Sequence, residues 1–198
     1  MITVSGMECA GSTAVWQMIN QLGFQAKKEH GYTRDVIVFA TLRDIRDVVT
    51  SLWRRECLGL RNDPDNYALG CFRYALPRYE SMCRYEKDDN AIIIRYEDFV
   101  RDPGNTLDLI CKTLAVTITL ERRAEILESC SLKKNKERAS RLADFSEWDS
   151  KDLIHGNHIS TNGKVGSWSD LAVGLKPETV EFIEDGAREF LVHFNYET

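Results

Sequence analysis

The N-terminal stretch Ile2-Thr3-Val4-Ser5-Gly6-Met7-Glu8-Cys9-Ala10-Gly11-Ser12-Thr13 is the part of the sequence that decides the fold. Its first residues are mostly β-branched and predict a strand, its two glycines predict a turn, and a helix is expected from about Ser12 to Leu22. A loop of this kind can turn backbone N–H groups inward, and the helix N-terminus adds partial positive charge. The stretch therefore predicts either a phosphate- or sulfate-binding loop or an ordinary structural turn.

Outward from this stretch, short apolar segments alternate with longer amphipathic ones, while residues 133–162 are charged and predict no regular element. The continuous apolar runs among the predicted strands are typical of parallel strands that are buried on both faces. This alternation predicts an α/β fold with a mostly parallel sheet. Strands are expected at Phe24–Glu29, Asp35–Thr41 and Ala91–Arg95, and helices after an N-cap at Asp44, at Tyr67–Tyr85, Pro103–Leu114 and Leu120–Cys130, and from Pro177.

The composition is that of an ordinary globular protein, with 198 residues, 43% of them hydrophobic, and a formal net charge of −5. The length suits a single domain over residues 1–198. No basic stripe dominates the sequence, which argues against nucleic acid as a partner. No apolar run is long enough to cross a bilayer, and the N-terminus lacks the shape of a signal peptide. A cytoplasmic protein with no membrane span is expected.

The six cysteines show neither a C-x-x-C pair nor a Cys/His metal spacing. Several lie on predicted apolar helix faces, where a free cysteine behaves as a small hydrophobic residue. Reduced and mostly buried thiols, without a metal, are expected at Cys9, Cys57, Cys71, Cys83, Cys111 and Cys130.

A second candidate site follows the predicted strand Asp35–Thr41, in the run Leu42–Leu52. Arg43 precedes the next helix and Ser51 lies two helical turns along it, so both side chains can reach one anion beside that helix. The alternative is structural: Arg43 pairs with a nearby aspartate, and Ser51 bonds back to its own helix. On this run alone, the structural alternative is favoured.

Four segments in this order resemble the sulfotransferases that use 3′-phosphoadenosine 5′-phosphosulfate, over nearly the whole chain. The run Arg43–Ser51 is similar to the family's Arg-Asp-Pro-Arg-Asp-Val-x-x-Ser, and Arg95–Pro103 to its Arg-Tyr-Glu-Asp-Leu…Asp-Pro. The loop Gly6–Thr13 resembles the family's 5′-phosphosulfate loop, and Gly163–Trp168 its last cofactor loop. The resemblance implies a P-loop-type three-layer fold whose sheet has about four or five strands. It also implies transfer of a sulfuryl group to a hydroxyl of a small molecule or carbohydrate, leaving 3′,5′-adenosine bisphosphate, with no metal needed.

The same resemblance implies roles for individual residues. Arg43 and Ser51 would hold the 3′-phosphate, and Gly163 and Lys164 would also contact the nucleotide. Ser131–Lys134 weakly resembles an adenine-contacting stretch, although a solvated basic helix start is favoured there. The 5′-phosphosulfate would lie on Cys9, Ala10, Gly11, Ser12 and Thr13.

The general base is expected in the run Lys28-Glu29-His30, which matches a Lys-x-His of many family members. His30 would take the proton of the acceptor hydroxyl, because an imidazole accepts protons near neutral pH. Glu29 is the alternative base. A solvent-exposed histidine without a catalytic role fits the sequence equally well.

One departure from the family pattern bears on activity. Cys9 stands where the family has a lysine or arginine, and Glu8 adds a negative charge beside it. A thiol cannot stabilise the charge that develops on the bridging oxygen, so slow turnover or none is expected. An impaired, nucleotide-binding relative that acts as a binding module is therefore the alternative function. A P-loop kinase using ATP is a further alternative, disfavoured because Ser12 occupies the position of its lysine.

Overall fold

Four parallel strands form the central sheet, in the order β2-β1-β3-β4. The computed structural model describes residues 1–56, 64–144, 146–156, 158–159, 163–170 and 174–196. The mostly parallel sheet and its flanking helices confirm the predicted α/β class. In chain order the elements are β1 (Ile2–Gly6), α1 (Ser12–Gln21), β2 (Ala26–Lys28), β3 (Ile37–Leu42), α2 (Ile45–Glu56), α3 (Pro64–Tyr85), β4 (Ala91–Arg95), α4 (Tyr96–Arg101), α5 (Pro103–Thr113), α6 (Leu120–Ser129), α7 (Leu132–Ala139), β5 (Trp148–Asp149), β6 (Ile154–His155), the 3₁₀ helix η1 (Ser167–Ser169) and α8 (Pro177–His193).

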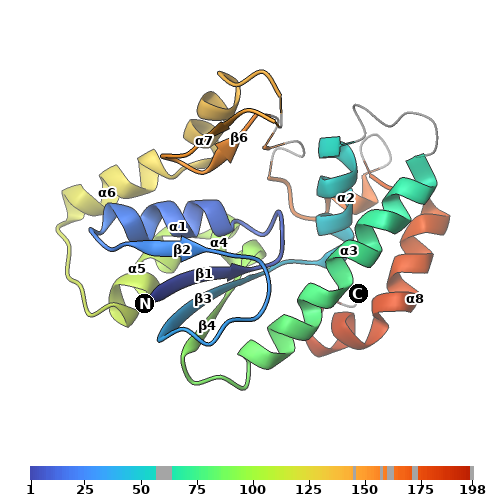
Figure 1. Ribbon diagram of the computed structural model, residues 1–198, viewed down its shortest axis with the longest axis horizontal. Coiled ribbons are helices and arrows are strands. Elements are labelled where there is room, and N and C mark those ends of the chain that lie inside the picture. Colours follow the sequence, from blue (N-terminus) through green and yellow to red (C-terminus); the bar gives the residue numbers. More distant parts are fainter. Residues whose placement is uncertain (57–63, 145, 157, 160–162, 171–173, 197–198) are drawn as a thin grey trace.

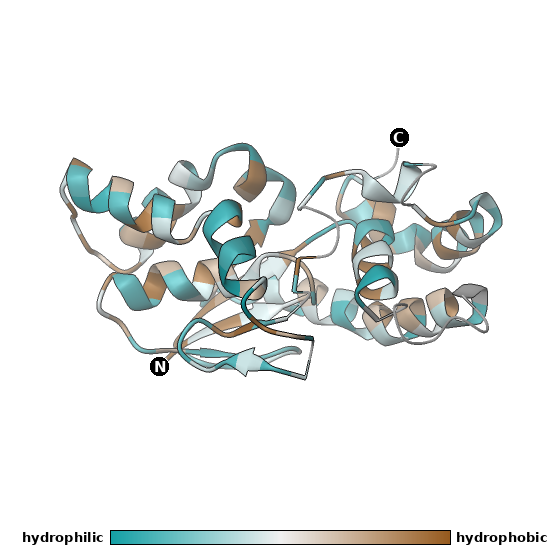
Figure 2. Cartoon of the chain, turned by 90° about the horizontal axis from the view of Figure 1, so that it is seen from above, coloured by the Kyte–Doolittle hydropathy of each residue, from teal (hydrophilic) through white to brown (hydrophobic). Residues whose placement is uncertain are grey.

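Helices cover both faces of the sheet, as the continuous apolar run in β3 predicts (Figure 1). Val38, Ala40 and Leu42 pack against α2, α3 and α8. Phe39 points to the opposite face, where α1, α5 and α6 cover the sheet. This alternation follows from the period of two along a strand. Apolar and polar segments alternate along the surrounding helices (Figure 2), as expected when each helix buries one face.

The structure corrects several predicted boundaries. The strand expected at Phe24–Glu29 is limited to β2, and β3 begins at Ile37 rather than Asp35. The prediction that residues 133–162 lack regular structure was wrong, because they contain most of α7 and the antiparallel pair β5 and β6. Helix α7 begins where the Ser131 side chain accepts a hydrogen bond from the backbone of Lys134, 3.2 Å away. This N-cap stabilises a helix whose composition carries little apolar signal.

The N-cap predicted at Asp44 is present. Its Oδ1 accepts a hydrogen bond from the backbone N–H of Arg46 at 2.9 Å, and its carbonyl accepts one from Val48 at 3.0 Å. The cap therefore sets the start of α2 directly after Arg43. No helix in the described ranges is long and apolar enough to cross a membrane. Cys57 lies outside the described residues, and the free thiols among those described are Cys9, Cys71, Cys83, Cys111 and Cys130, three of which are buried.

Gly6 ends β1 with a positive φ of 129°. A Cβ at this position would lie 2.3 Å from the carbonyl oxygen of Thr41 on β3, so only glycine lets the two strands pair here. The pairing continues beyond the strand, since Met7 N–H donates to that same carbonyl at 3.0 Å. Gly6 therefore determines where the loop between β1 and α1 leaves the sheet.

We expect Gly6→Ala to lower the free energy of unfolding by about 2–4 kcal/mol, because it combines an unfavourable φ with a backbone clash. Gly23→Ala is the matched control: Gly23 also has a positive φ, of 92°, but nothing lies within 4 Å of its Cβ position. The control should cost about 1 kcal/mol. Urea unfolding measures both, and equal losses would contradict the role given to the β3 backbone.

Candidate functional site

The loop between β1 and α1 has the backbone of an anion-binding turn. Cys9 and Gly11 both adopt left-handed conformations, with φ of 58° and 82°. Gly11 is the N-cap of α1, and no side chain among the described residues caps this helix. Its first N–H groups can therefore bind an anion, which the helix dipole also favours. Of the predicted loop residues, Ala10 is buried in the core, whereas Cys9, Gly11, Ser12 and Thr13 line cavities.

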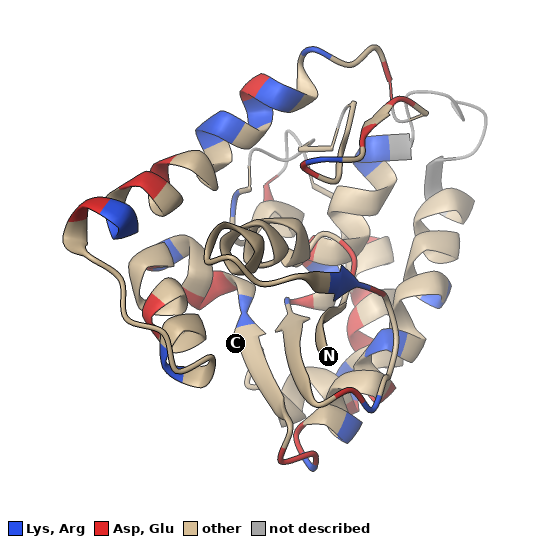
Figure 3. Ribbon diagram, turned by 60° about the vertical axis from the view of Figure 1, so that its left-hand side comes forward, with Lys and Arg blue, Asp and Glu red and all other residues tan. Residues whose placement is uncertain are grey.

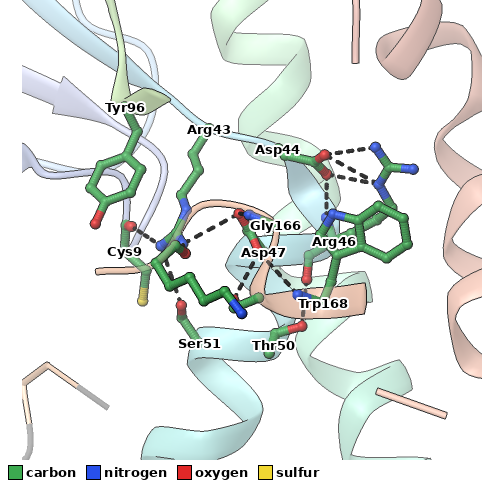
Figure 4. Close-up of polar contacts among 12 residues, drawn as sticks. Cys9, Arg43, Asp44, Arg46, Asp47, Thr50, Ser51, Tyr96, Gly166 and Trp168 are labelled. Atoms are coloured by element: carbon green, nitrogen blue, oxygen red, sulfur yellow. Dashed lines mark hydrogen bonds and ion pairs between the residues drawn. The ribbon is translucent and has the colours of Figure 1, made fainter. Parts of the chain in front are cut away.

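Arg43 lies at the centre of the site, with only 2% of its surface exposed (Figure 4). Its Nη1 donates to the carbonyl of Cys9 at 2.9 Å and to the hydroxyl of Ser51 at 3.3 Å. Its Nη2 donates to the carbonyl of Lys164 at 2.9 Å and lies 3.4 Å from Oδ2 of Asp47. One guanidinium thus joins the loop after β1, helix α2 and the loop before η1. Arg43 therefore lies beside both Ser51 and an aspartate, and binding of one anion by Arg43 and Ser51 stays a prediction.

Asp47, fully buried, attaches the Gly163–Trp168 segment to α2. Its carboxylate accepts hydrogen bonds from Gly166 N and Ser167 Oγ, each at 2.8 Å, and from Trp168 N at 3.2 Å. The predicted segment is therefore at the site. The Lys164 side chain is directed elsewhere: its Nζ pairs with Asp170 at 2.8 Å, and Lys164 contributes its carbonyl to Arg43.

The Tyr96–Glu97 pair comes to the site from the carboxyl end of β4. The ring of Tyr96 stacks on Arg43, 4.2 Å from the guanidinium carbon, and its hydroxyl donates to the carbonyl of Gly163 at 3.0 Å. Burial raises the pKa of the Tyr96 hydroxyl, so it stays protonated and able to donate. Glu97 accepts a hydrogen bond from the backbone N–H of Asp44 at 3.2 Å. These contacts hold the start of α4 against the start of α2.

Two cavities meet at the loop, and we call them cavity A and cavity B. Cavity A measures about 300 Å³ and has mostly apolar walls, while cavity B measures about 560 Å³ and carries more charge. Cys9, Gly11, Thr13 and His158 line both. Cavity A is further lined by Arg43, Ser51, Tyr96, Phe99, Leu132, Asn135 and Gly163, among others, and cavity B by Glu8, Ser12, Lys28, His30, Arg55, Tyr67 and Tyr74, among others.

Four buried side-chain atoms among the described residues have no hydrogen-bond partner: Glu8 Oε2, Arg43 Nε, Arg55 Nε and His158 Nδ1. All four residues line cavity A or cavity B. Burying a polar atom without a partner costs free energy, so such atoms are rare in folded proteins. Their concentration around these two cavities marks the cavities as a place where polar ligand atoms fit.

Cavity B contains two cations next to the loop. Lys28 Nζ donates to Thr13 Oγ1 at 2.7 Å, and Arg55 Nη1 lies 3.6 Å from Cys9 Sγ. Burial lowers the pKa of Lys28 to about 8, and the positive charge of Arg55 contributes to this shift. Burial also raises the pKa of the Cys9 thiol, which is therefore neutral at pH 7. Lys28 and Arg55 thus provide positive charge that the loop itself lacks.

His158 closes the junction between the cavities, with its Nε2 3.4 Å from Thr13 Oγ1. Burial, together with the charges of Lys28 and Arg55, lowers its pKa to about 3, so the imidazole is neutral.

His30 and Glu8 lie next to each other in the wall of cavity B. His30 Nδ1 lies 3.1 Å from the carbonyl of Gly6 and 3.9 Å from Glu8 Oε1. Because a carbonyl can only accept, Nδ1 carries the proton and Nε2 is left as the basic nitrogen. The charge that Glu8 adds to the loop is offset by Arg78, whose Nε lies 3.2 Å from Glu8 Oε1.

The sequence did not indicate Lys28 as a site residue, although Lys28 belongs to the Lys-x-His run in which the general base was predicted. Arg55 was not predicted at all. Nothing but its helical spacing from Ser51 could have indicated Arg55. In the weakly matching Ser131–Lys134 stretch, Ser131 and Leu132 line cavity A, while Ser131 also caps α7. Nucleotide contact by this stretch stays a prediction.

A parallel sheet with an anion-binding loop between β1 and α1 defines a P-loop-type α/β protein. Residues 28–194 match the sulfotransferase domain family, and the chain belongs to that family. The Gly6–Thr13 loop lies before the matched range, in keeping with its departures from the family pattern. A search of curated protein sequences finds no match.

Solved sulfotransferase-fold structures resemble the whole described fold. Retinol dehydratase in complex with androsterone and the inactive cofactor PAP superposes with a TM-score of 0.74 at 13% identity, covering 96% of this chain and 80% of that one. Mouse sulfotransferase SULT7A1 in complex with PAP superposes with a TM-score of 0.69 at 14% identity, covering 96% of this chain and 84% of that one. Retinol dehydratase in complex with retinol and PAP superposes with a TM-score of 0.69 at 15% identity, covering 96% of this chain and 80% of that one. At these identities the likeness concerns the fold.

We expect Asp47→Ala to lower the free energy of unfolding by about 3–5 kcal/mol, because it leaves the buried charge of Arg43 without its carboxylate. Asp98→Ala is the control, since Asp98 pairs with Arg101 on the surface, and it should cost at most about 0.5 kcal/mol. Urea unfolding measures both losses. Similar small losses at the two positions would show that Asp47 does not hold the site together.

Proposed function

We propose that this protein transfers a sulfuryl group from 3′-phosphoadenosine 5′-phosphosulfate to a hydroxyl of a small molecule or carbohydrate. The observation that carries the proposal is the meeting of two cavities at one anion-binding loop, with Arg43 and Ser51 on the side of cavity A. Membership of the sulfotransferase family supports the reaction. The PAP held by the solved neighbours supports the donor, and their retinol and androsterone favour a small alcohol as acceptor.

Cavity A fits the nucleotide. Arg43 Nε is buried without a hydrogen-bond partner and Ser51 Oγ lies 3.3 Å from the same guanidinium, so both can bind the 3′-phosphate. The N–H groups at the start of α1 would bind the 5′ end. Tyr96, Phe99 and Leu132 give the apolar walls that an adenine ring requires, and the volume lies at the lower end of ordinary ligand sites.

When bound, the nucleotide supplies a sulfuryl group whose bond to the bridging oxygen breaks as a bond to the acceptor oxygen forms. His30 takes the hydroxyl proton on Nε2, because Nδ1 already donates to Gly6. Glu8, 3.9 Å away, stabilises the imidazolium that results. Glu29, the alternative base, is exposed, as His30 is. Glu29 lines neither cavity A nor cavity B, whereas His30 lines cavity B, so we favour His30.

A catalytically silent, nucleotide-binding protein is the second candidate function. It is favoured by the neutral Cys9 thiol in the loop, where transfer needs positive charge. The two candidates share the nucleotide site and differ in turnover alone, so an assay of sulfuryl transfer to simple alcohols separates them.

We expect the protein to bind 3′,5′-adenosine bisphosphate more tightly than AMP, which lacks the 3′-phosphate. Ser51→Ala should weaken bisphosphate binding about tenfold, because it removes one hydrogen bond to a charged group, and should leave AMP binding unchanged. Isothermal titration calorimetry measures both ligands. Binding of Mg-ATP in preference to the bisphosphate would contradict the proposal and favour a kinase.

The affinity for the bisphosphate should be highest near pH 7 and fall as the pH rises through about 8. Lys28 is charged below its pKa of about 8, and losing that charge removes an attraction to the 5′-phosphate. By pH 9.5 we expect roughly a tenfold loss. Lys28→Arg, which stays charged, should abolish the loss, whereas Lys27→Ala on the exposed side of β2 should leave it intact. An unchanged pH profile in Lys28→Arg would show that Lys28 does not face the anion.

A further inference from the structure

The Gly6–Thr13 loop contains neither lysine nor arginine, and its position 9 is a neutral thiol. Group transfer from a phosphosulfate leaves negative charge on the bridging oxygen, and a fixed cation at that point normally contributes a large part of catalysis. If this protein is an enzyme, the cation has to come from outside the loop. The side chains that line cavity B include such cations, Lys28 and Arg55.

Arg55 reaches the loop from α2. Ser51 and Arg55 are four residues apart and therefore lie on one face of the helix, one turn from each other. Ser51 lines cavity A and Arg55 lines cavity B. The Nη1 of Arg55 lies 3.6 Å from Cys9 Sγ, so the guanidinium occupies the space next to the side chain at position 9.

The charges around Arg55 favour an anion rather than a protein partner. Lys28 also lines cavity B and contacts the loop at Thr13. Glu8 is the acidic residue among the described lining of cavity B, and it is already paired with Arg78. His158 is neutral, and the charge of Arg55 helps to lower the pKa of Lys28 and of His158, while it opposes the rise that burial causes in the pKa of Cys9. Arg55 and Lys28 thus add positive charge at the loop, although the whole chain is at −5.

We propose that Arg55 is a catalytic residue that binds the 5′ end of the nucleotide at the loop and replaces the missing cation of position 9. This inference rests on the proposed function and deepens it. In the transfer step the bridging oxygen keeps the electron pair of the broken S–O bond, and Arg55 neutralises the charge that it gains. The sulfur forms its new bond to the acceptor oxygen, and the hydroxyl proton goes to His30.

The test compares two ligands by calorimetry: 3′,5′-adenosine bisphosphate, and adenosine 3′-monophosphate, which lacks the 5′-phosphate. Arg55→Ala should weaken binding of the bisphosphate about tenfold and leave binding of the 3′-monophosphate unchanged, because Arg55 contacts only the 5′ end of the nucleotide. Sulfuryl transfer should fall about a hundredfold in kcat/KM. Arg54→Ala, which removes the same charge from the neighbouring position of α2, should change each quantity less than twofold.

A second variant separates a direct contact between Arg55 and the nucleotide from a structural role of Arg55. Adding Cys9→Lys to Arg55→Ala places an ammonium in the same space and should restore bisphosphate affinity to within about threefold of wild type. Equal affinities of Arg55→Ala and wild type, an equal loss for both ligands, or a loss that Cys9→Lys does not restore would overturn the inference. Failure of the wild-type protein to bind the bisphosphate would overturn the proposed function instead.

Discussion

The structure of the site depends on one buried guanidinium, that of Arg43. A charge so fully removed from water is stable only where carboxylate and carbonyl oxygens surround it, and here they come from three separate segments. The loop after β1, helix α2 and the loop before η1 are therefore brought together by the need to satisfy a single side chain (Figure 4). Asp47 completes this arrangement, because it binds Arg43 and the backbone of residues 166–168 at the same time. The same contacts bring Ser51 and the start of α1 to the wall of one cavity.

Charge is distributed unevenly around this centre. Basic and acidic segments are interspersed along the outer helices (Figure 3), which agrees with a chain that is mildly acidic overall. At the junction of the two cavities, by contrast, Lys28 and Arg55 flank the loop, and Arg78 offsets Glu8. The loop sequence alone indicates a site weakened by Cys9 and Glu8. In three dimensions, cations from neighbouring elements lie beside both residues.

The sequence predicted the fold class and the capped start of α2, because these depend on local patterns, namely apolar runs and an N-cap. Helical spacing indicated that Arg43 and Ser51 lie close together, whereas Gly163 was linked to them only through the family resemblance. Prediction from the sequence was wrong or incomplete where tertiary contacts determine the structure. Helix α7 depends on its cap and packing more than on apolar periodicity, so residues 133–162 were expected to be irregular. Arg55 was missed because only its helical spacing from Ser51 distinguishes it from Arg54. Lys164 was expected to contact a nucleotide; its ammonium pairs with Asp170 and its carbonyl binds Arg43, and nucleotide contact stays a prediction.

A crystal structure of the complex with 3′,5′-adenosine bisphosphate tests the proposed nucleotide site most directly. We predict the 3′-phosphate within hydrogen-bond distance of Arg43 and Ser51, the adenine against Tyr96 and Leu132, and the 5′-phosphate on the backbone N–H groups at the start of α1. A bisphosphate bound in the reverse orientation, or bound away from cavity A, would contradict this prediction.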